Sequence, residues 1–232
     1  MNETDFFATL RAGGSPDFLR CECGEMTTRL PCWSCAQREE RALVVRQEEE
    51  LRGIPARYRW ARRGAELNAR SHVVPSRHYA NADEGAARLA ASSAIGALLI
   101  GPAGSGKTSL AVAAMREVRG SFFVSANALE RARIEHRSGE GEAPLVARAK
   151  RAPVLVIDDL GQDKPSSVSA VEAVILARHD AELRTWVTTG LDAGSPRDTY
   201  PALEARYGAG VVRRLTERGT ARVMRFTLPG AA

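Results

Sequence analysis

The sequence predicts an α/β protein in which a parallel five-stranded sheet lies between helices, with a small cysteine-rich module ahead of it. Three observations predict this arrangement. Short apolar runs alternate with segments of helical periodicity, a glycine-rich loop joins one run to a helix, and all four cysteines lie within residues 21–35. Strands that alternate with helices favour a parallel sheet with right-handed crossovers.

Length and composition limit the choice of architecture and location. A chain of 232 residues has room for one α/β domain and a small appendage. The net charge of +5 is compatible with a polyanionic partner. The longest apolar run, residues 94–101, is too short to cross a bilayer, and the acidic N-terminus is unlike a secretory signal. We therefore expect a cytoplasmic protein without membrane contact.

The first element is the cysteine-rich module, which we assign to residues 1–36. Its spacing is C-x-C-x8-C-x2-C. In a reducing compartment clustered cysteines are more often metal ligands than disulfides, and four thiolates suit a closed tetrahedral zinc site. Redox pairs or incidental thiols are the alternative. The predicted zinc ligands are Cys21, Cys23, Cys32 and Cys35.

A charged helix and an arginine-rich segment follow. Glu and Arg at helical spacings predict a linker helix over residues 37–53, ended by Gly53 and Pro55. Residues 52–77 then hold seven Arg and one acidic residue, with Tyr58 and Trp60 between them. Arginines with aromatics can bind single-stranded nucleic acid. Equally, the two aromatics could pack on the following domain, which we assign to residues 54–232.

The central motif is a phosphate-binding loop. An apolar strand over residues 96–100 leads into G-x-x-x-x-G-K-T and then into a helix, the context that this motif requires. Backbone N–H groups and the helix N-terminus would bind the phosphates of ATP. Lys107 would reach the β- and γ-phosphates and Thr108 would ligate Mg²⁺. The predicted binding residues are Gly101, Pro102, Ala103, Gly104, Ser105, Gly106, Lys107 and Thr108.

A pair of carboxylates follows a second buried strand, residues 154–157. Ligands of open α/β sheets bind at the carboxyl ends of the strands, where Asp158 and Asp159 lie. Asp158 would hold Mg²⁺ through water, and Asp159 would act as the general base on the attacking water. A helix cap or a turn is the alternative role for adjacent aspartates. Further strands are expected over residues 121–127, 184–192 and 221–226, with a helix over 169–183 before the second of these.

The order of several short motifs resembles that of the AAA+ ATPases of the DnaC/DnaI helicase-loader type and their IstB-like transposition relatives. The resemblance covers roughly residues 52–228, and its motifs are "GIPARY", "GPAGSGKT", "VLVIDDLG", "TWVTTGL" and "YGAGVVRRLTERG". It implies an AAA+ P-loop domain without a C-terminal helical lid, and an ATPase.

The same resemblance implies roles for three further positions. Arg214 would be the arginine finger that reaches a neighbouring subunit's nucleotide, with Arg213 as the alternative, so the protein would self-associate through its ATPase interface. Thr188 and Thr189 end the sensor strand, and Thr189 is included among the catalytic residues. Gly190 stands where relatives usually have Asn, which predicts slow hydrolysis.

These features favour an oligomeric AAA+ ATPase that loads a replicative hexameric helicase onto single-stranded DNA. The alternatives are an IstB-like transposition helper that binds duplex DNA and recruits a transposase, a small-molecule P-loop kinase and a nucleotide-independent zinc regulator. Arg131, Arg133 and Arg137 are further candidates for DNA contact. Residues 1–35 carry a net charge of −2 and more apolar side chains than a zinc knuckle can bury, so we expect this module to bind the helicase rather than DNA.

Overall fold

The computed structural model describes residues 19–27, 29–59, 61, 86–137, 139–163, 169–196, 198–217 and 219–226. The chain divides into two compact units, Met1–Glu49 and Glu50–Ala232. Each is described by itself below. Among the described residues, no helix is long and apolar enough to cross a membrane.

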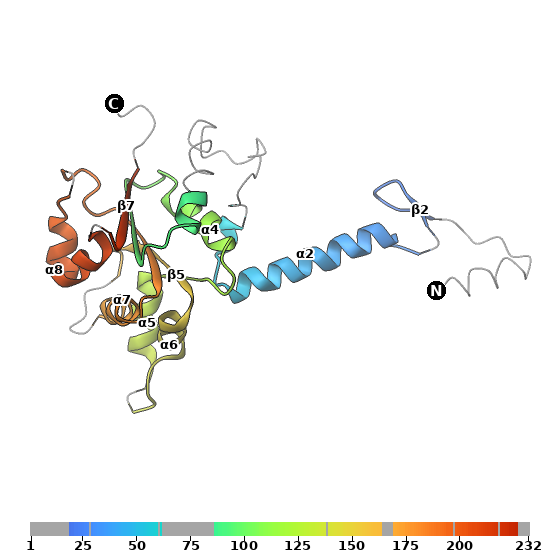
Figure 1. Ribbon diagram of the computed structural model, residues 1–232. Coiled ribbons are helices and arrows are strands. Elements are labelled where there is room, and N and C mark those ends of the chain that lie inside the picture. Colours follow the sequence, from blue (N-terminus) through green and yellow to red (C-terminus); the bar gives the residue numbers. More distant parts are fainter. Residues whose placement is uncertain are drawn as a thin grey trace, which may run out of the picture. The chain divides into compact units, whose positions relative to one another are not determined.

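The second unit is built on a five-stranded sheet with the order β4–β5–β6–β3–β7 (Figure 1). All its neighbouring strands are parallel, which confirms the predicted fold class. The strands are β3 (Gly96–Ile100), β4 (Phe122–Ser125), β5 (Val154–Leu160), β6 (Arg184–Thr189) and β7 (Ala221–Arg225). β4 ends earlier than expected because the Ser125 hydroxyl accepts a hydrogen bond from Ala128 N and caps the next helix.

Side chains from alternate positions of the strands enter two separate cores, one on each face of the sheet. On one face, Leu99 of β3 and Trp186 of β6 pack against helix α4 (Lys107–Arg116) and the short helix η1 (Ala56–Tyr58). On the other, Leu98 and Val187 pack against α5 (Ala126–Glu135), α6 (Pro144–Arg151), α7 (Ala170–Asp180) and α8 (Pro201–Thr216). Successive residues of a strand therefore pack against different helical layers, one on each face of the sheet.

Arg178 in α7 joins several of these elements from inside the second core. It is fully buried, and burial lowers the pKa of its guanidinium to about 10. The guanidinium donates hydrogen bonds to the carbonyl oxygens of Ala149, Lys150, Ala152 and Arg184 and to Thr185 Oγ1. Because the first three carbonyls lie at the end of α6 and the last two groups lie in β6, one side chain holds a helix end, a helix and a strand together.

The first unit contains a short hairpin and a long helix. β1 (Leu19–Arg20) pairs antiparallel with β2 (Met26–Thr27). Helix α2 (Trp33–Leu51) begins at the residue after Cys32, the first cysteine of the second pair. The helix predicted over residues 37–53 therefore begins four residues earlier, at Trp33, and ends two residues earlier, at Leu51. Several apolar side chains of this unit are exposed, with Trp33 at 74% and Met26 at 62% of their surface.

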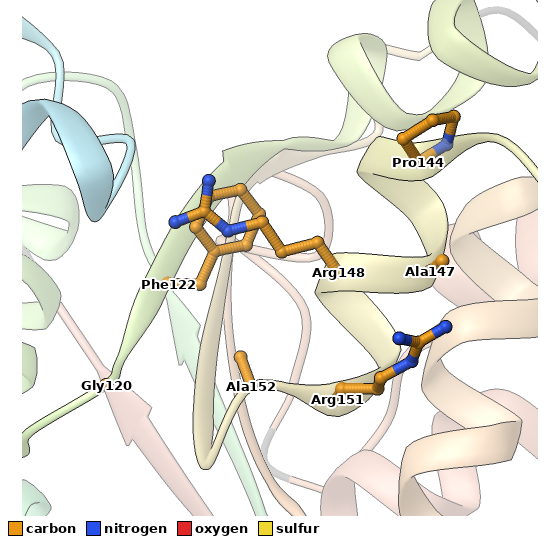
Figure 2. A pocket seen from close by; sticks show the side chains of 7 residues that line it. All are labelled: Gly120, Phe122, Pro144, Ala147, Arg148, Arg151 and Ala152. Atoms are coloured by element: carbon orange, nitrogen blue, oxygen red, sulfur yellow. The ribbon is translucent and has the colours of Figure 1, made fainter.

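Residues 50–59 are fastened to the edge of the sheet in the second unit, and we call them the tether. Phe123 N in edge strand β4 donates to Arg52 O at 2.8 Å, and Arg148 in α6 donates to Leu51 O. The Arg148 guanidinium lies over the Phe122 ring at 4.2 Å, as Figure 2 shows, beside a hollow of about 510 Å³. The tether therefore covers a strand edge that would otherwise expose unpaired backbone groups.

Candidate functional site

The phosphate-binding loop runs from the end of β3 to the start of α4, as predicted. Gly104 (φ 78°) and Gly106 (φ 90°) have left-handed backbone conformations that glycine adopts without strain. Gly101 is required for a different reason. A Cβ there would lie 2.7 Å from both Cβ and O of Phe226, the residue that follows β7. The loop's glycines thus serve both its curvature and the close approach of the edge strand.

Lys107 is the first residue of α4, and its side chain is folded back onto the loop. Its Nζ donates to Gly101 O and Pro102 O, both at 2.8 Å. Burial lowers the pKa of this ammonium, while the carboxylates of Asp159 and Asp158 act in the opposite direction. The positive group therefore lies inside the loop whose backbone would surround a phosphate. Lys107 and the phosphate loop therefore fit a bound nucleoside triphosphate.

Asp158 brings three elements together at the carboxyl end of the sheet. Its Oδ1 accepts hydrogen bonds from Thr108 Oγ1 (2.7 Å) and Thr188 Oγ1 (2.6 Å). Burial raises the pKa of Asp158, and these two hydrogen bonds oppose that rise. Asp158 therefore lies beside the hydroxyl predicted to ligate Mg²⁺, where a carboxylate could hold the ion through one of its water ligands.

Asp159 follows this cluster and is exposed, whereas Asp158 is buried. The β5–β6 register shifts between Ile157 and Leu160, and Asp159 has φ 56°, so the strand bulges where the two aspartates lie. Asp159 N donates to Thr188 Oγ1 at 3.0 Å, while its side chain is exposed. The bulge separates a buried carboxylate from a solvent-accessible one, as a metal ligand and a general base would require.

Thr189, which we had included among the catalytic residues, is not brought to the carboxylates. Its Oγ1 donates to Leu160 O and accepts from Leu191 N, on the opposite face of the sheet. Thr188 lies beside Asp158 because it is two residues after Trp186 in β6 and therefore faces the same side of the sheet, the side that α4 covers. Gly190 follows, and a Cβ there would meet only Gly101 O, at 3.9 Å.

Arg214 lies far from the phosphate loop of its own chain. Its backbone carbonyl approaches the first residue of β3, where a Cβ on Gly96 would be only 2.8 Å from it. The loop follows the last residue of β3, about 13 Å away along the strand. The Arg214 side chain donates a hydrogen bond to Gly210 O, and Arg214 Nη2 lies 4.0 Å from Asp180 Oδ1. Arg213, by contrast, is exposed.

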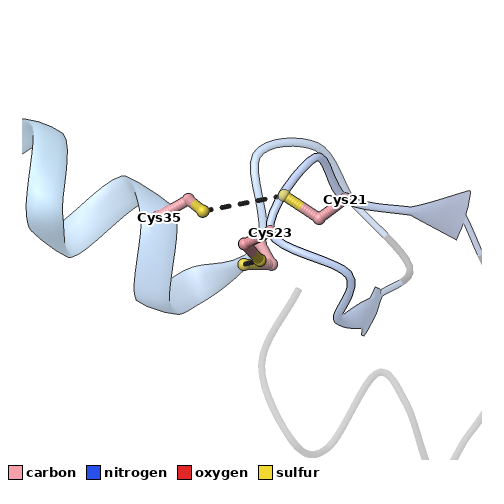
Figure 3. Close-up of side chains that lie close together, drawn as sticks. Cys21, Cys23 and Cys35 are labelled. Carbon is pink, nitrogen blue, oxygen red and sulfur yellow. Dashed lines mark hydrogen bonds between the residues drawn. The ribbon is translucent and has the colours of Figure 1, made fainter.

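The four cysteines form one cluster, and Figure 3 shows three of them. All four Sγ atoms lie within 4.8 Å of one another, with Cys23–Cys32 at 3.4 Å and Cys21–Cys35 at 3.7 Å. Four thiolates around one Zn²⁺ have sulfur–sulfur distances of about 3.8 Å. Backbone N–H groups of Cys32 and then Cys23 lower the pKa of the Cys21 thiol to about 6. The donor set therefore fits zinc.

The candidate DNA-binding arginines are placed only in part. Residues 60 and 62–77 lie outside the described residues. Within the tether, Arg52 donates to Arg116 O at 3.2 Å, and Tyr58 packs near Phe123, with ring centroids 6.4 Å apart. Arg131 pairs with Glu135. Arg133 and Arg137 line a hollow of about 460 Å³ together with His136, Gly141, Glu142, Ala143 and Val146.

Arg57 is a residue whose position the sequence did not indicate. A contact with the Tyr58 hydroxyl is the largest cause that raises the pKa of Arg57, and the charges of Asp158 and Asp159 add to it. The element "GIPARY" therefore brings a cation within electrostatic range of carboxylates about a hundred positions later. The only sequence signal for this position of Arg57 is that an arginine-rich segment precedes the P-loop helix along the chain.

Comparison with known proteins agrees with this geometry. Residues 87–189 match the family model of IstB-like ATP binding proteins. A crystal structure of the DnaC helicase loader is similar at 23% identity and a TM-score of 0.56, covering 74% of this chain and 99% of that one. A crystal structure of DnaI is similar at 24% identity and 0.50, covering 70% and 88%. These likenesses show a shared AAA+-like fold. No curated protein matches the chain significantly.

Proposed function

We propose that this protein is an ATP-dependent loader of a replicative helicase onto single-stranded DNA. It acts as an oligomeric AAA+ ATPase. The observation that supports this proposal best is the combination of a complete phosphate loop and carboxylate pair with a separate four-cysteine module. The proposed parts are the zinc module in residues 1–36, the linker helix in 37–53 and the ATPase domain in 54–232.

Hydrolysis is assigned to the phosphate loop and the two aspartates. Mg²⁺ bound by Thr108 and Asp158 would neutralise charge on the phosphates. Lys107 holds the phosphates, and the exposed Asp159 carboxylate accepts a proton from the attacking water. Lys107→Ala should abolish ATP binding, whereas Asp159→Asn should bind ATP without turning it over. Fluorescent-nucleotide titration and phosphate release measure the two steps. Full turnover by Asp159→Asn would remove that residue from the reaction.

Oligomerisation is inferred from the position of the arginine pair. Because Arg214 lies at the opposite end of β3 from its own phosphate loop, it could serve only the nucleotide of another copy. An arginine finger raises the rate by about 10³–10⁵ in P-loop enzymes. Arg214→Ala should bind ATP but lose hydrolysis and ATP-dependent assembly. Arg213→Ala is the matched comparison, because Arg213 is the more exposed of the pair; if only that variant is inactive, Arg213 is the finger.

The N-terminal module is proposed to bind the helicase. Trp33 and Leu30 are exposed at 74% and 52%, and aromatic anchors of this kind dominate many protein interfaces. Trp33→Ser in the full chain should weaken capture of the host's replicative helicase at least tenfold. Ile134→Ser, which removes a similarly exposed side chain at 68%, should not. Equal capture by both variants would contradict this role of the module.

Single-stranded DNA is proposed to bind the ATPase domain near α5. Arg133 and Arg137 line one hollow, and the exposed Ile134 lies between them in sequence. Affinity from phosphate contacts must fall with salt, with a slope of about −0.7 per contact on single strands. Replacing Arg133 and Arg137 together by Ala should flatten this slope, whereas the exposed Arg151→Ala should leave it unchanged. A salt-independent affinity would exclude a backbone-binding mode.

The match to IstB-like ATP binding proteins supports one second candidate, a transposition helper. Such a protein would bind duplex DNA and recruit a transposase. Capture experiments with the full chain, offered the host's helicase and transposase with either single-stranded or duplex DNA, separate the two functions. Preference for duplex DNA and transposase would replace the loader proposal.

A further inference from the structure

A buried hydrogen-bond network connects the turn after the aspartate pair to helix α8. Tyr207 in α8 and Asp163 in the turn are each exposed over only 5% of their surface. Tyr207 Oη donates a hydrogen bond to Asp163 Oδ1. Gly161 N donates to Tyr207 Oη at 2.8 Å and to Asp163 Oδ1 at 3.1 Å. Arg206 adds a bond to Asp163 O and one to Tyr207 Oη.

This network controls the backbone on which Asp159 lies. Gln162 N donates to Asp159 O at 3.0 Å, so residues 159–162 form a tight turn. Within it Asp159 has φ 56° and Gly161 has φ 107°. A left-handed conformation at a non-glycine residue is unfavourable and persists only where its surroundings enforce it. The exposure of the Asp159 carboxylate depends on that conformation, because Asp159 is exposed at the bulge while the adjacent Asp158 is buried.

We propose that Tyr207 and Asp163 are positioning residues for the reaction, which fix the Asp159 carboxylate by holding the turn that follows it. This inference rests on the proposed ATPase function. Neither residue touches the nucleotide site directly. Tyr207 acts through the two hydrogen bonds of its hydroxyl, one accepted from Gly161 N and one donated to Asp163. These bonds connect the turn to α8, a helix that starts 42 positions after Asp159.

The position of Tyr207 within α8 gives the network a second connection. Gly208, the next residue, has φ 79° and ψ 152° and breaks the helix into two parts. The first part carries Tyr207 and meets the turn, and the second carries Arg213 and Arg214. The same helix therefore holds the general-base turn of its own subunit and presents the arginine proposed to serve another subunit.

The chain offers a matched control in Tyr200. It caps the same helix and is equally buried, at 6% exposed. Its ring lies under Arg225, at 5.6 Å from the guanidinium carbon. Tyr200→Phe and Tyr207→Phe therefore remove the same atom from the same helix, but only the second removes a bond to the turn. Any general loosening of α8 should appear in both variants.

The test measures hydrolysis, ATP affinity and backbone exchange in the full-length chain. Tyr207→Phe should lower kcat about tenfold or more with ATP affinity unchanged within twofold, because displacement of a catalytic group lowers the rate without affecting phosphate binding. Asp163→Ala should show the same split. The double variant should be slower than either single variant, because Gly161 N then loses both acceptors, but by less than the product of the two effects, because both changes break the Tyr207–Asp163 bond. Tyr200→Phe should match the wild type.

Three results of the hydrolysis and ATP-binding measurements would overturn the proposal. They are an unchanged kcat in a folded Tyr207→Phe, an equal loss in Tyr200→Phe, and a loss of ATP affinity, which would place the effect at the phosphate loop. Amide exchange of residues 158–163 gives a second reading that needs no hydrolysis. It should accelerate in Tyr207→Phe and Asp163→Ala only. If the wild type hydrolyses no ATP, the ATPase proposal fails, and unchanged exchange in these variants would separately refute the positioning role.

Discussion

Thr188 and Thr189 are adjacent residues with opposite surroundings. The Thr188 hydroxyl donates to Asp158 and accepts from the Asp159 backbone, whereas the Thr189 hydroxyl joins Leu160 to Leu191 behind the sheet. Of the two threonines expected at the end of β6, the site therefore contains Thr188 and not Thr189, which the sequence analysis included among the catalytic residues. Successive strand residues point to opposite faces, so a one-position error exchanges a structural residue for one in the site.

The pair provides a prediction in which two isosteric changes have different effects. Thr188→Val removes both links to the aspartates, so it should lower the rate of ATP hydrolysis about tenfold while the protein stays folded. Thr189→Val leaves Leu160 O without its donor, so it should lower the free energy of unfolding by about 1–3 kcal/mol with little effect on the rate of the folded fraction. Urea unfolding and phosphate release measure the two effects. The reverse pattern would return Thr189 to the catalytic group.

Gly190 has space for a side chain, which Gly101 does not. A Cβ at Gly190 meets one atom at 3.9 Å, an ordinary contact, whereas a Cβ at Gly101 collides with Phe226 at 2.7 Å. Gly190→Asn should therefore fold normally and raise the slow rate of hydrolysis expected from the missing amide. Gly101→Ala should lose ATP binding. Thermal unfolding and phosphate release test both, and an unchanged rate in Gly190→Asn would show that Thr188 already suffices.

At the scale of elements, the apolar runs predicted the five strands but not their order. An apolar run such as residues 184–189 predicts a strand, but the position of that strand between β5 and β3 depends on tertiary pairing. That placement is what brings Thr188 next to Asp158. The network of Asp163 and Tyr207 was equally unpredictable. Although Tyr207 begins the motif "YGAGVVRRLTERG", the two residues lie 44 positions apart, and nothing in the sequence indicates that they meet. The phosphate loop and the carboxylates were predictable because each chemistry is encoded within a few consecutive residues.

Arg178 allows a test of how the helical layer is held. Arg178→Met keeps the apolar stem but leaves four buried carbonyl oxygens without their donor. We expect the free energy of unfolding to fall by about 3 kcal/mol or more. The exposed Arg151→Met in neighbouring α6 should change it by about 0.5 kcal/mol at most. Urea unfolding measures both, and a loss below about 1 kcal/mol at Arg178 would show that water replaces the guanidinium.

At the scale of the whole molecule, the two units are expected to depend on different supports. Among the described residues 19–36, Cys21 and Cys32 are the buried apolar side chains, whereas Leu19, Met26, Leu30 and Trp33 are exposed, so zinc would supply the folding energy of this part. The second unit has a core on each face of its sheet. Cys32→Ser should therefore release zinc and unfold residues 19–35 while ATP affinity is retained. Elemental analysis and nucleotide titration provide the measurements, and a folded protein with well under one zinc per chain would refute the metal site.

The P-loop helix has a consequence for how force and nucleotide are related. α4 starts at Lys107 in the phosphate loop and ends at Arg116, whose carbonyl accepts from Arg52 and whose Nη2 donates to Arg59 O at 2.8 Å. A ten-residue helix is a strut about 15 Å long. Thermodynamic coupling is reciprocal. If phosphate binding shifts this strut, then a load applied to the tether must change the affinity for ATP by the same free energy, and a partner that pulls on the tether would set when nucleotide is released.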